Sequence, residues 1–223
     1  MTAASAADGS VYVSSTYNKA FTFAGKEVAD PEGLTSACIA KYNGNGEEQW
    51  AVTMEGGALV YALDTDEDGT LYAAGNFMDA VKYTGTDGTT GELAGGADVY
   101  TAFVAKISKD GTIEGIKTFA PVVNSAIMES FMYFPEPGYV YVTPNNIKID
   151  GEKVYVSATY TADVEELGWK ATYLNVFDFM YMENKSAGIF SLNKNDLSNP
   201  ASGSVVQRVG DDGIFLAEQG FEQ

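Results

Sequence analysis

The chain has 223 residues, of which 31 are acidic and 13 basic, and it contains one cysteine and no histidine. Its formal charge of −18 repels nucleic-acid backbones and anionic membrane surfaces, and it leaves cations, basic proteins and neutral glycans as partners. The missing histidine excludes Ser-His-Asp and Cys-His catalysis and every zinc site that needs an imidazole. The single Cys38 cannot form an internal disulfide, and its place in an apolar strand indicates a buried, unreactive thiol.

The remaining composition is typical of a turn-rich all-β protein. The chain has 24 glycines, 14 tyrosines and 12 phenylalanines, and its hydrophobic content of 45% suffices for one compact domain over residues 1–223. No apolar run approaches the roughly 18 residues that a membrane span needs. The first residues lack the basic and then apolar pattern of a signal segment. Either the chain is cytoplasmic, or a signal segment is absent from this sequence.

The first predicted unit covers residues 1–55 and contains four short strands. It begins with a turn and a strand, written DGSVYV, at residues 8–13, because Asp-Gly pairs favour tight hairpin turns. The third strand is ACIAKY at residues 37–42, and the fourth covers residues 46–54.

The second predicted unit, residues 57–120, repeats this pattern. Its motif DGTLYA, at residues 68–73, lies sixty positions after DGSVYV, and AFVAKI at residues 102–107 matches ACIAKY. Between these motifs we expect a polar, Gly-rich connection over residues 84–98. AFVAKI and ACIAKY are almost continuously apolar, which is typical of inner strands that are covered on both faces.

The third predicted unit, residues 139–210, follows the pattern less closely. DGEKVYV at residues 150–156 supplies the turn and the second strand. The third strand, AGIFSL at residues 187–192, lacks the Ala-Lys pair, and the fourth covers residues 204–209. We expect residues 214–221 to begin a fourth unit.

Three copies of a four-stranded unit predict an all-β protein of propeller-type blades, because one unit is too small to bury its own faces. Three blades are fewer than the four that a closed propeller needs. The expected architecture is therefore an incomplete propeller, or one that a second copy completes. Exposed blade edges would favour self-association.

The repeated motifs also resemble a known family. DTDEDGTLYAAGNF, TAFVAKISKDGTIEGIKTF and DGSVYVSSTY are similar to the bacterial seven-bladed β-propeller repeat. The resemblance covers most of residues 1–120 and part of 140–210. It implies a propeller fold and an extracytoplasmic setting, secreted or on the surface of a bacterium. It implies no reaction, because the family has no catalytic motif to transfer.

One turn has the opening pattern of a calcium loop. Asp64, Asp66 and Asp68 stand before Gly69 in the order D-x-D-x-D-G, which brings alternate oxygens towards one ion. Gly75 occupies the twelfth position, where such a loop needs a bidentate glutamate, and a strand follows instead of a helix. A hairpin turn with solvated carboxylates is the preferred interpretation, and a weak calcium site at these three residues is the alternative. No other cofactor is expected.

Two segments rich in aromatic residues, 120–138 and 161–186, have no counterpart in the first unit. Large aromatics in loops either pack on each other or form a binding surface for sugar rings or proteins. We expect the two segments to lie against one another, with at least one aromatic side chain facing solvent. The candidate ligand-binding residues are Phe131, Tyr133, Trp169 and Tyr173.

The leading functional hypothesis is a non-enzymatic binding or adhesion scaffold that presents loops to a protein or a glycan. The first rival is a glycan-active enzyme, since glycosidases need only two carboxylates at the right separation. The second rival is a structural module of a larger surface protein. Two carboxylates in a groove beside aromatic residues would favour the enzyme, and fully buried aromatics would favour the structural module.

Overall fold

The computed structural model describes residues 1–31, 35–122, 140–171, 173–177, 180–183, 186–209 and 213–217. Over these residues the chain is all-β, as predicted, and none of its sheets is closed. A 3₁₀ helix covers Glu165–Leu167. Among the described residues, no helix is long and apolar enough to cross a membrane.

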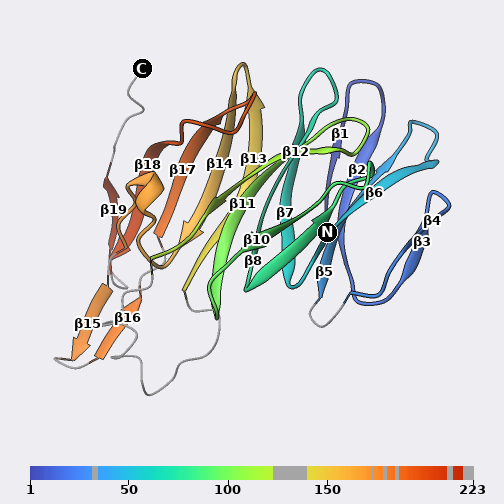
Figure 1. Cartoon of the computed structure of the whole chain (residues 1–223). Helices are drawn as coiled ribbons and strands as arrows, with labels where there is room; N and C mark the ends of the chain where they lie inside the picture. The colour runs from blue at the N-terminus through green and yellow to red at the C-terminus, as the bar shows by residue number, and fades with distance from the viewer. Residues whose placement is uncertain are drawn as a thin grey trace.

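Three four-stranded antiparallel meanders, here called the first, second and third sheets, lie side by side in chain order (Figure 1). The first sheet contains β1 (Thr2–Ser5), β2 (Val11–Tyr17), β5 (Ser36–Tyr42) and β6 (Glu48–Glu55). The second contains β7 (Ala58–Thr65), β8 (Leu71–Phe77), β11 (Val99–Ile107) and β12 (Ile113–Phe119). The third contains β13 (Val140–Asp150), β14 (Lys153–Tyr160), β17 (Ser186–Asn193) and β18 (Ala201–Val209).

The strand registers show that the repeated motifs occupy equivalent places. Tyr12 pairs with Lys41 in the first sheet, and Tyr72 pairs with Lys106 in the second. In the third sheet, Tyr155 pairs with Ser191 at the same position. The prediction that the three Asp-Gly turns join equivalent first and second strands is therefore confirmed.

The end of the chain differs from the prediction. Residues 213–217 form β19 (Gly213–Ala217), which pairs antiparallel with β18 and so widens the third sheet instead of starting a fourth unit. The second and third sheets also touch where the first residues of β11 run parallel to the first residues of β13, with Val99 opposite Val140 and Tyr100 opposite Tyr141.

Five hairpin turns share one hydrogen-bonding pattern, which explains their glycines. At residues 66–70 the Asp66 amide donates to the Thr70 carbonyl at 3.0 Å, and the Gly69 amide donates to the Asp66 carbonyl at 3.1 Å. Gly69 has φ of +80°, a left-handed conformation that costs little only for glycine. The same pattern recurs at residues 6–10, 43–47, 85–89 and 108–112.

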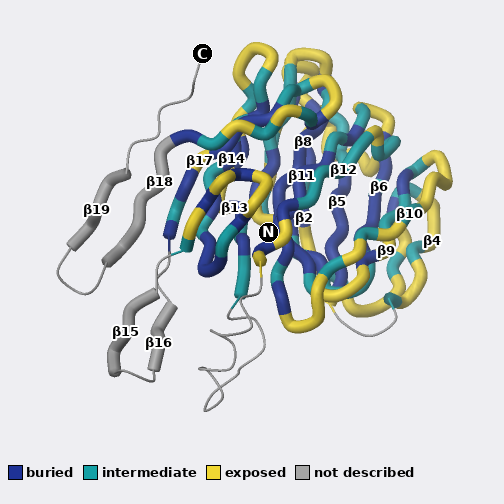
Figure 2. Tube along the Cα trace, turned by 60° about the vertical axis from the view of Figure 1, so that its left-hand side comes forward, coloured by how far each residue is buried: buried dark blue, intermediate teal, exposed yellow. Residues whose placement is uncertain are grey.

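Two apolar clusters hold the three sheets together, one on each face of the second sheet. Figure 2 shows that the buried residues gather along the central strands, while the turns are exposed. Leu71, Ala73 and Phe103 face the first sheet, while Tyr72 and Val104 face the third. Every residue of β8 is buried, because neither face of this strand meets solvent. The expectation of an inner strand covered on both faces is confirmed for β11, and residues 36–40 of β5 are buried as well.

The tyrosine and lysine of the repeated motif hydrogen-bond to the neighbouring sheet. The Tyr12 hydroxyl donates to the Gly69 carbonyl at 2.9 Å, and the Tyr72 hydroxyl donates to the Lys194 carbonyl at 3.0 Å. The ammonium groups of Lys41 and Lys106 make equivalent contacts, which reach the carbonyls of Lys109 at 2.9 Å and Asn195 at 3.0 Å. These residues therefore link each sheet to the turns of the next.

Each unit carries an additional two-stranded hairpin between its second and third main strands. The hairpins are β3 (Phe21–Phe23) with β4 (Lys26–Val28), β9 (Ala80–Thr84) with β10 (Thr90–Ala94), and β15 (Tyr173–Phe177) with β16 (Met180–Glu183). This corrects two expectations: residues 84–98 are not simply a connection, and segment 161–186 does have a counterpart in the first unit. Because β9 also pairs with β6, the second hairpin extends the first sheet.

Candidate functional site

The structure places Trp169 in the core and not on a surface. Its side chain is 1% exposed, stacks on Tyr160 with ring centroids 4.7 Å apart, and meets the ring of Phe190 edge-on at 5.9 Å. Gly188 makes room for it, since a Cβ at that position would lie 2.6 Å from the indole Cζ2. The prediction of Trp169 as an exposed binding residue is therefore wrong. Because Gly188 has no side chain, the indole packs directly against the third sheet.

Tyr173 lies in β15, for which only the backbone is described, and Phe131 and Tyr133 lie outside the described residues. Near the start of the two aromatic segments the Val122 amide donates to the Asp163 carbonyl at 2.8 Å, and residues 123–138 of the first segment lie outside the described residues, so the predicted packing of the two segments stays a prediction.

The aspartates of the predicted calcium loop contact different groups of the protein. Asp64 accepts a hydrogen bond from the Ile149 amide at 2.8 Å and forms an ion pair with Lys148 at 3.0 Å. Asp66 Oδ1 accepts from the amides of Asp68 and Thr70, which closes the turn. Across the part of the chain that the structure describes, no three acidic or cysteine side chains are placed to hold a metal ion. The weak calcium site stays a prediction.

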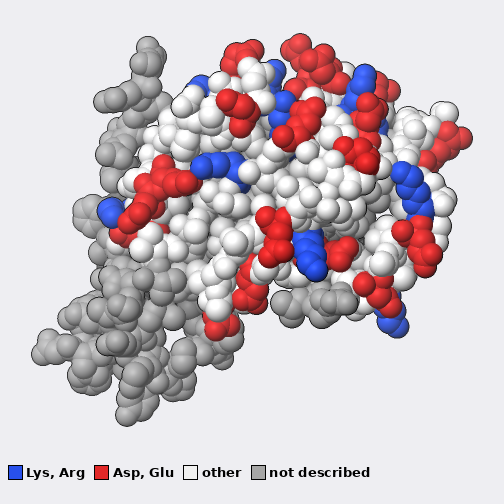
Figure 3. Space-filling model, in the orientation of Figure 1, with Lys and Arg blue, Asp and Glu red and all other residues white. Residues whose placement is uncertain are grey.

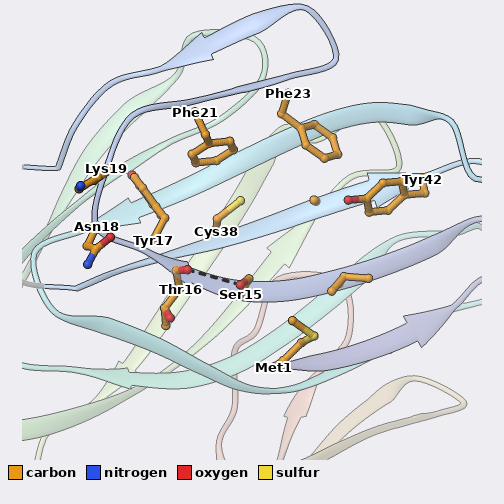
Figure 4. Close-up of a pocket in the computed structure, with 12 residues that line it drawn as sticks. Met1, Ser15, Thr16, Tyr17, Asn18, Lys19, Phe21, Phe23, Cys38 and Tyr42 are labelled. Carbon is orange, nitrogen blue, oxygen red and sulfur yellow. Dashed lines mark hydrogen bonds between the residues drawn. The ribbon is translucent and has the colours of Figure 1, made fainter.

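A cavity among the described residues lies instead on the outer face of the first sheet, the face turned away from the second sheet. The β3–β4 hairpin covers this face and encloses about 390 Å³ (Figure 4). Phe21 and Phe23 point from the hairpin towards the sheet, and Cys38 lies on the floor below them. The lining residues are Met1, Val13, Ser15, Thr16, Tyr17, Asn18, Lys19, Phe21, Phe23, Cys38, Ala40 and Tyr42.

Small side chains at two strand positions explain why space remains here. Cys38 pairs with Ser15 as Phe103 pairs with Gly75, so Cys38 stands where the second sheet has a phenylalanine. Phe103 fills the interface between the first two sheets, where it is fully buried. The smaller thiol, with Ala40 beside it, leaves a shallow floor that the hairpin bridges.

Two aromatic pairs form the walls. The Phe21 ring meets Tyr17 edge-on at 5.2 Å, and the Phe23 ring meets Tyr42 at 5.3 Å. A two-residue turn at Ala24 and Gly25, both with positive φ, reverses the hairpin. Its tip is held to the first sheet, because the Ala24 amide donates to Glu48 Oε2 at 2.7 Å.

The cavity is neutral apart from one lysine side chain. None of its lining residues is acidic, and Lys19 is the charged side chain among them. Burial, with the charge of Glu55 as a second cause, raises the pKa of Tyr17 to about 12, and burial raises the pKa of the Cys38 thiol to about 11. Both groups are therefore protonated at neutral pH. The wall offers aromatic faces, hydroxyls and an amide to a neutral ligand.

A second cavity of about 310 Å³ lies on the other side of the same hairpin. Phe23 lines both cavities, and the second also has Trp50 in its wall. This second cavity is more polar, because Lys26, Glu27 and Glu55 border it. It also reaches Thr84 at the end of β9 and Thr86 in the β9–β10 turn.

Sequence reasoning missed this region, although two signals were present. Residues 21–28, FTFAGKEV, place an Ala-Gly pair, which suits a turn, after the short apolar-polar-apolar run FTF. Comparison of ACIAKY with AFVAKI shows Cys38 in place of Phe103, a loss of side-chain volume at a core position.

No protein-family model matches this sequence, and no curated protein matches it significantly. The resemblance to the bacterial propeller repeat, and the setting that it implies, therefore stay predictions.

Proposed function

We propose that the protein is a binding module for neutral glycans, and that the cavity under the β3–β4 hairpin is its recognition site. The observation that carries the proposal is the lining: two aromatic pairs with neutral hydroxyl and amide groups around a cavity of about 390 Å³. Small-ligand sites commonly span about 300 to 1,000 Å³ and combine apolar walls with a few polar groups. Sugar rings present both kinds of surface.

The electrostatics support a neutral ligand over an anionic one. The chain carries a formal charge of −18, which raises the cost of bringing an anion to any part of its surface. Within the cavity, Tyr17 and Cys38 are uncharged at neutral pH, since their ordinary pKa values of 10.0 and 9.0 lie above 7 and burial raises both further. A neutral, hydroxyl-rich glycan carries no charge, so the negative surface does not repel it.

The proposed architecture around this site is a stack of propeller-type blades that holds the hairpins in fixed positions. The repeated Tyr12 and Tyr72 contacts between neighbouring sheets support this interpretation, as does the burial of both faces of the second sheet. A rigid stack suits a binding scaffold, because little ordering is then left for the moment of binding.

A screen of neutral glycans followed by titration calorimetry tests the proposal. Tyr42→Ala and Phe21→Ala each remove one aromatic wall, and we expect roughly tenfold weaker binding from each, the equivalent of about 1.4 kcal/mol. Tyr61→Ala is the matched control, because Tyr61 is a 39% exposed aromatic of β7 outside the cavity. Circular dichroism checks that each variant is folded. Absence of binding to any neutral glycan, or equal losses in all three variants, would contradict the proposal.

A glycan-cleaving enzyme is the second candidate, because Glu27 and Glu55 border the second cavity together with Trp50. Binding without cleavage is preferred, since Glu27 is exposed whereas the acid of a glycosidase usually lies in an apolar environment. Release of reducing ends from a bound glycan, abolished in Glu55→Gln, would favour the enzyme.

A further inference from the structure

The floors of the two cavities form one continuous surface. The strand registers align Ser15 of β2 with Cys38 of β5, and Cys38 with Thr53 of β6. Thr53 in turn pairs with Thr84 of β9, the strand that the second hairpin adds to the first sheet. Ser15 and Cys38 line the first cavity, while Thr53 and Thr84 line the second.

This row of small side chains crosses four neighbouring strands. Adjacent strands lie about 4.8 Å apart, so three spacings give the row a length of roughly 14 Å. A parallel row, Val13, Ala40 and Ala51, runs beside it and is also made of small or medium apolar side chains. Together the two rows make a shallow trough perpendicular to the strands.

The β3–β4 hairpin crosses over this trough and divides it. Phe23 is 8% exposed and borders the cavity on each side. Beyond Phe23 the hairpin is tied to the far end of the trough, since Lys26 Nζ donates to the Thr86 carbonyl at 3.5 Å. The division into two cavities therefore comes from one aromatic side chain above a continuous floor.

The two ends of the trough differ in chemistry. The β2 end has aromatic walls from Tyr17 and Phe21, which suit the apolar face of a ring. The β9 end has the carboxylates of Glu27 and Glu55 and the hydroxyl of Thr86, which suit hydrogen bonds to sugar hydroxyls. An elongated ligand of repeated rings and hydroxyls can use both ends at once.

We propose that the two cavities are subsites of a single groove that binds a linear, neutral oligosaccharide across the strands of the first sheet, beneath the β3–β4 hairpin. This inference rests on the proposed function, and it adds chain length and direction to it. The first subsite holds one unit against the aromatic walls. The second subsite holds the following units by hydrogen bonds to Glu27 and Glu55.

Calorimetric titration with cello- and chito-oligosaccharides of one to six units tests the groove. We expect affinity to rise at least tenfold between one unit and four units, and then to level off when the trough is filled. Glu27→Ala alters the second subsite, so it should reduce the affinity for four units towards the affinity that the wild type has for one unit. Glu67→Ala, at an exposed acidic position in the β7–β8 turn, is the matched control for the change in charge.

The outcomes separate this inference from the function on which it rests. If short and long chains bind equally well, and Tyr42→Ala weakens both, the single-site function stands and the groove is overturned. If long chains bind more tightly, but the Glu27→Ala and Glu67→Ala variants have the same affinity for four units, the second subsite is overturned. If no oligosaccharide of either series binds at any length, both this inference and its glycan ligand are overturned for these probes, and the broader glycan screen decides the proposed function.

Discussion

At the scale of single residues, the tyrosine that recurs at positions 12 and 72 helps to explain why the motifs of the first two units are regularly spaced. Tyr12 and Tyr72 are buried aromatic side chains, and each also donates a hydrogen bond to a backbone carbonyl of the next sheet. A buried tyrosine needs such a partner, since an unpaired hydroxyl would lose its hydration without compensation. One side chain thus supplies both apolar contact and the alignment of neighbouring sheets.

Replacing Tyr12 by phenylalanine tests this double role. Tyr12→Phe keeps the ring but leaves the Gly69 carbonyl without its donor, so we expect the free energy of unfolding to fall by about 1 kcal/mol. Urea denaturation at pH 7 measures the change. An unaltered midpoint would show that water replaces the hydroxyl at no cost.

The same residue predicts a dependence of stability on alkaline pH. Burial raises the pKa of Tyr12 to about 12 from an ordinary value of 10.0. Above pH 10 the unfolded chain releases the phenolic proton while the folded chain keeps it, so stability is full below pH 10 and falls as the pH rises to 12. Denaturation between pH 9 and pH 12 should show a shallower decline in Tyr12→Phe than in the wild type.

Cys38 gives a chemical measure of the cavity floor. Because burial raises its pKa from 9.0 to about 11, its thiolate fraction at pH 8 falls about a hundredfold, and modification should slow at least in that proportion. The reaction with a disulfide reagent in 6 M urea at the same pH provides the reference rate. Equally fast reactions in the folded and unfolded protein would place Cys38 at an open surface.

At the scale of elements, the turn glycines set the hairpin geometry. Gly46 has φ of +80° and no neighbouring atom within 4 Å of an added Cβ, so Gly46→Ala isolates the cost of the left-handed backbone, about 1 kcal/mol. Gly115 of β12 has equal free space and no positive φ, so Gly115→Ala is the matched control. Thermal unfolding should show a lower midpoint for the first variant only. Equal midpoints would indicate that the turn adapts.

The main strands could be predicted from the sequence because their signals are local. Asp-Gly turns and apolar runs such as AFVAKI define hairpins without reference to distant residues. The β3–β4 hairpin was missed because its strands have three residues each, too few for a clear alternation. The burial of Trp169 depends on Gly188, which is distant in sequence and reveals its role only once the third sheet has formed. The cavity likewise depends on a register that places Cys38 opposite Ser15.

At the scale of the whole molecule, repulsion among the acidic side chains destabilises the compact folded state. Figure 3 shows acidic side chains along the upper edge and also over the rest of this face, with fewer basic ones between them. Four ion pairs among the described residues offset part of this repulsion. The net charge of −18 nevertheless leaves long-range repulsion that salt can screen.

Raising the ionic strength should therefore stabilise the protein at neutral pH. Between 0.01 M and 0.15 M salt the screening length shortens from about 30 Å to about 8 Å, and we expect the melting temperature to rise by a few degrees. At pH 4.1, near the isoelectric point of the sequence, the same step should have little effect. A fall in melting temperature with salt at pH 7 would show that attractive pairs dominate instead.

The two clusters on opposite faces of the second sheet determine the order in which the molecule opens. Detaching the first sheet exposes one face of β8 and leaves the other packed on the third sheet, so either outer sheet can open while the rest stays folded. Amide hydrogen exchange followed by mass spectrometry should then be slowest in β8 and β11 and faster in β1 and β2. The proposed glycan groove lies on an outer sheet, so a bound ligand should slow exchange in β2, β5 and β6 while the rates in β8 stay unchanged.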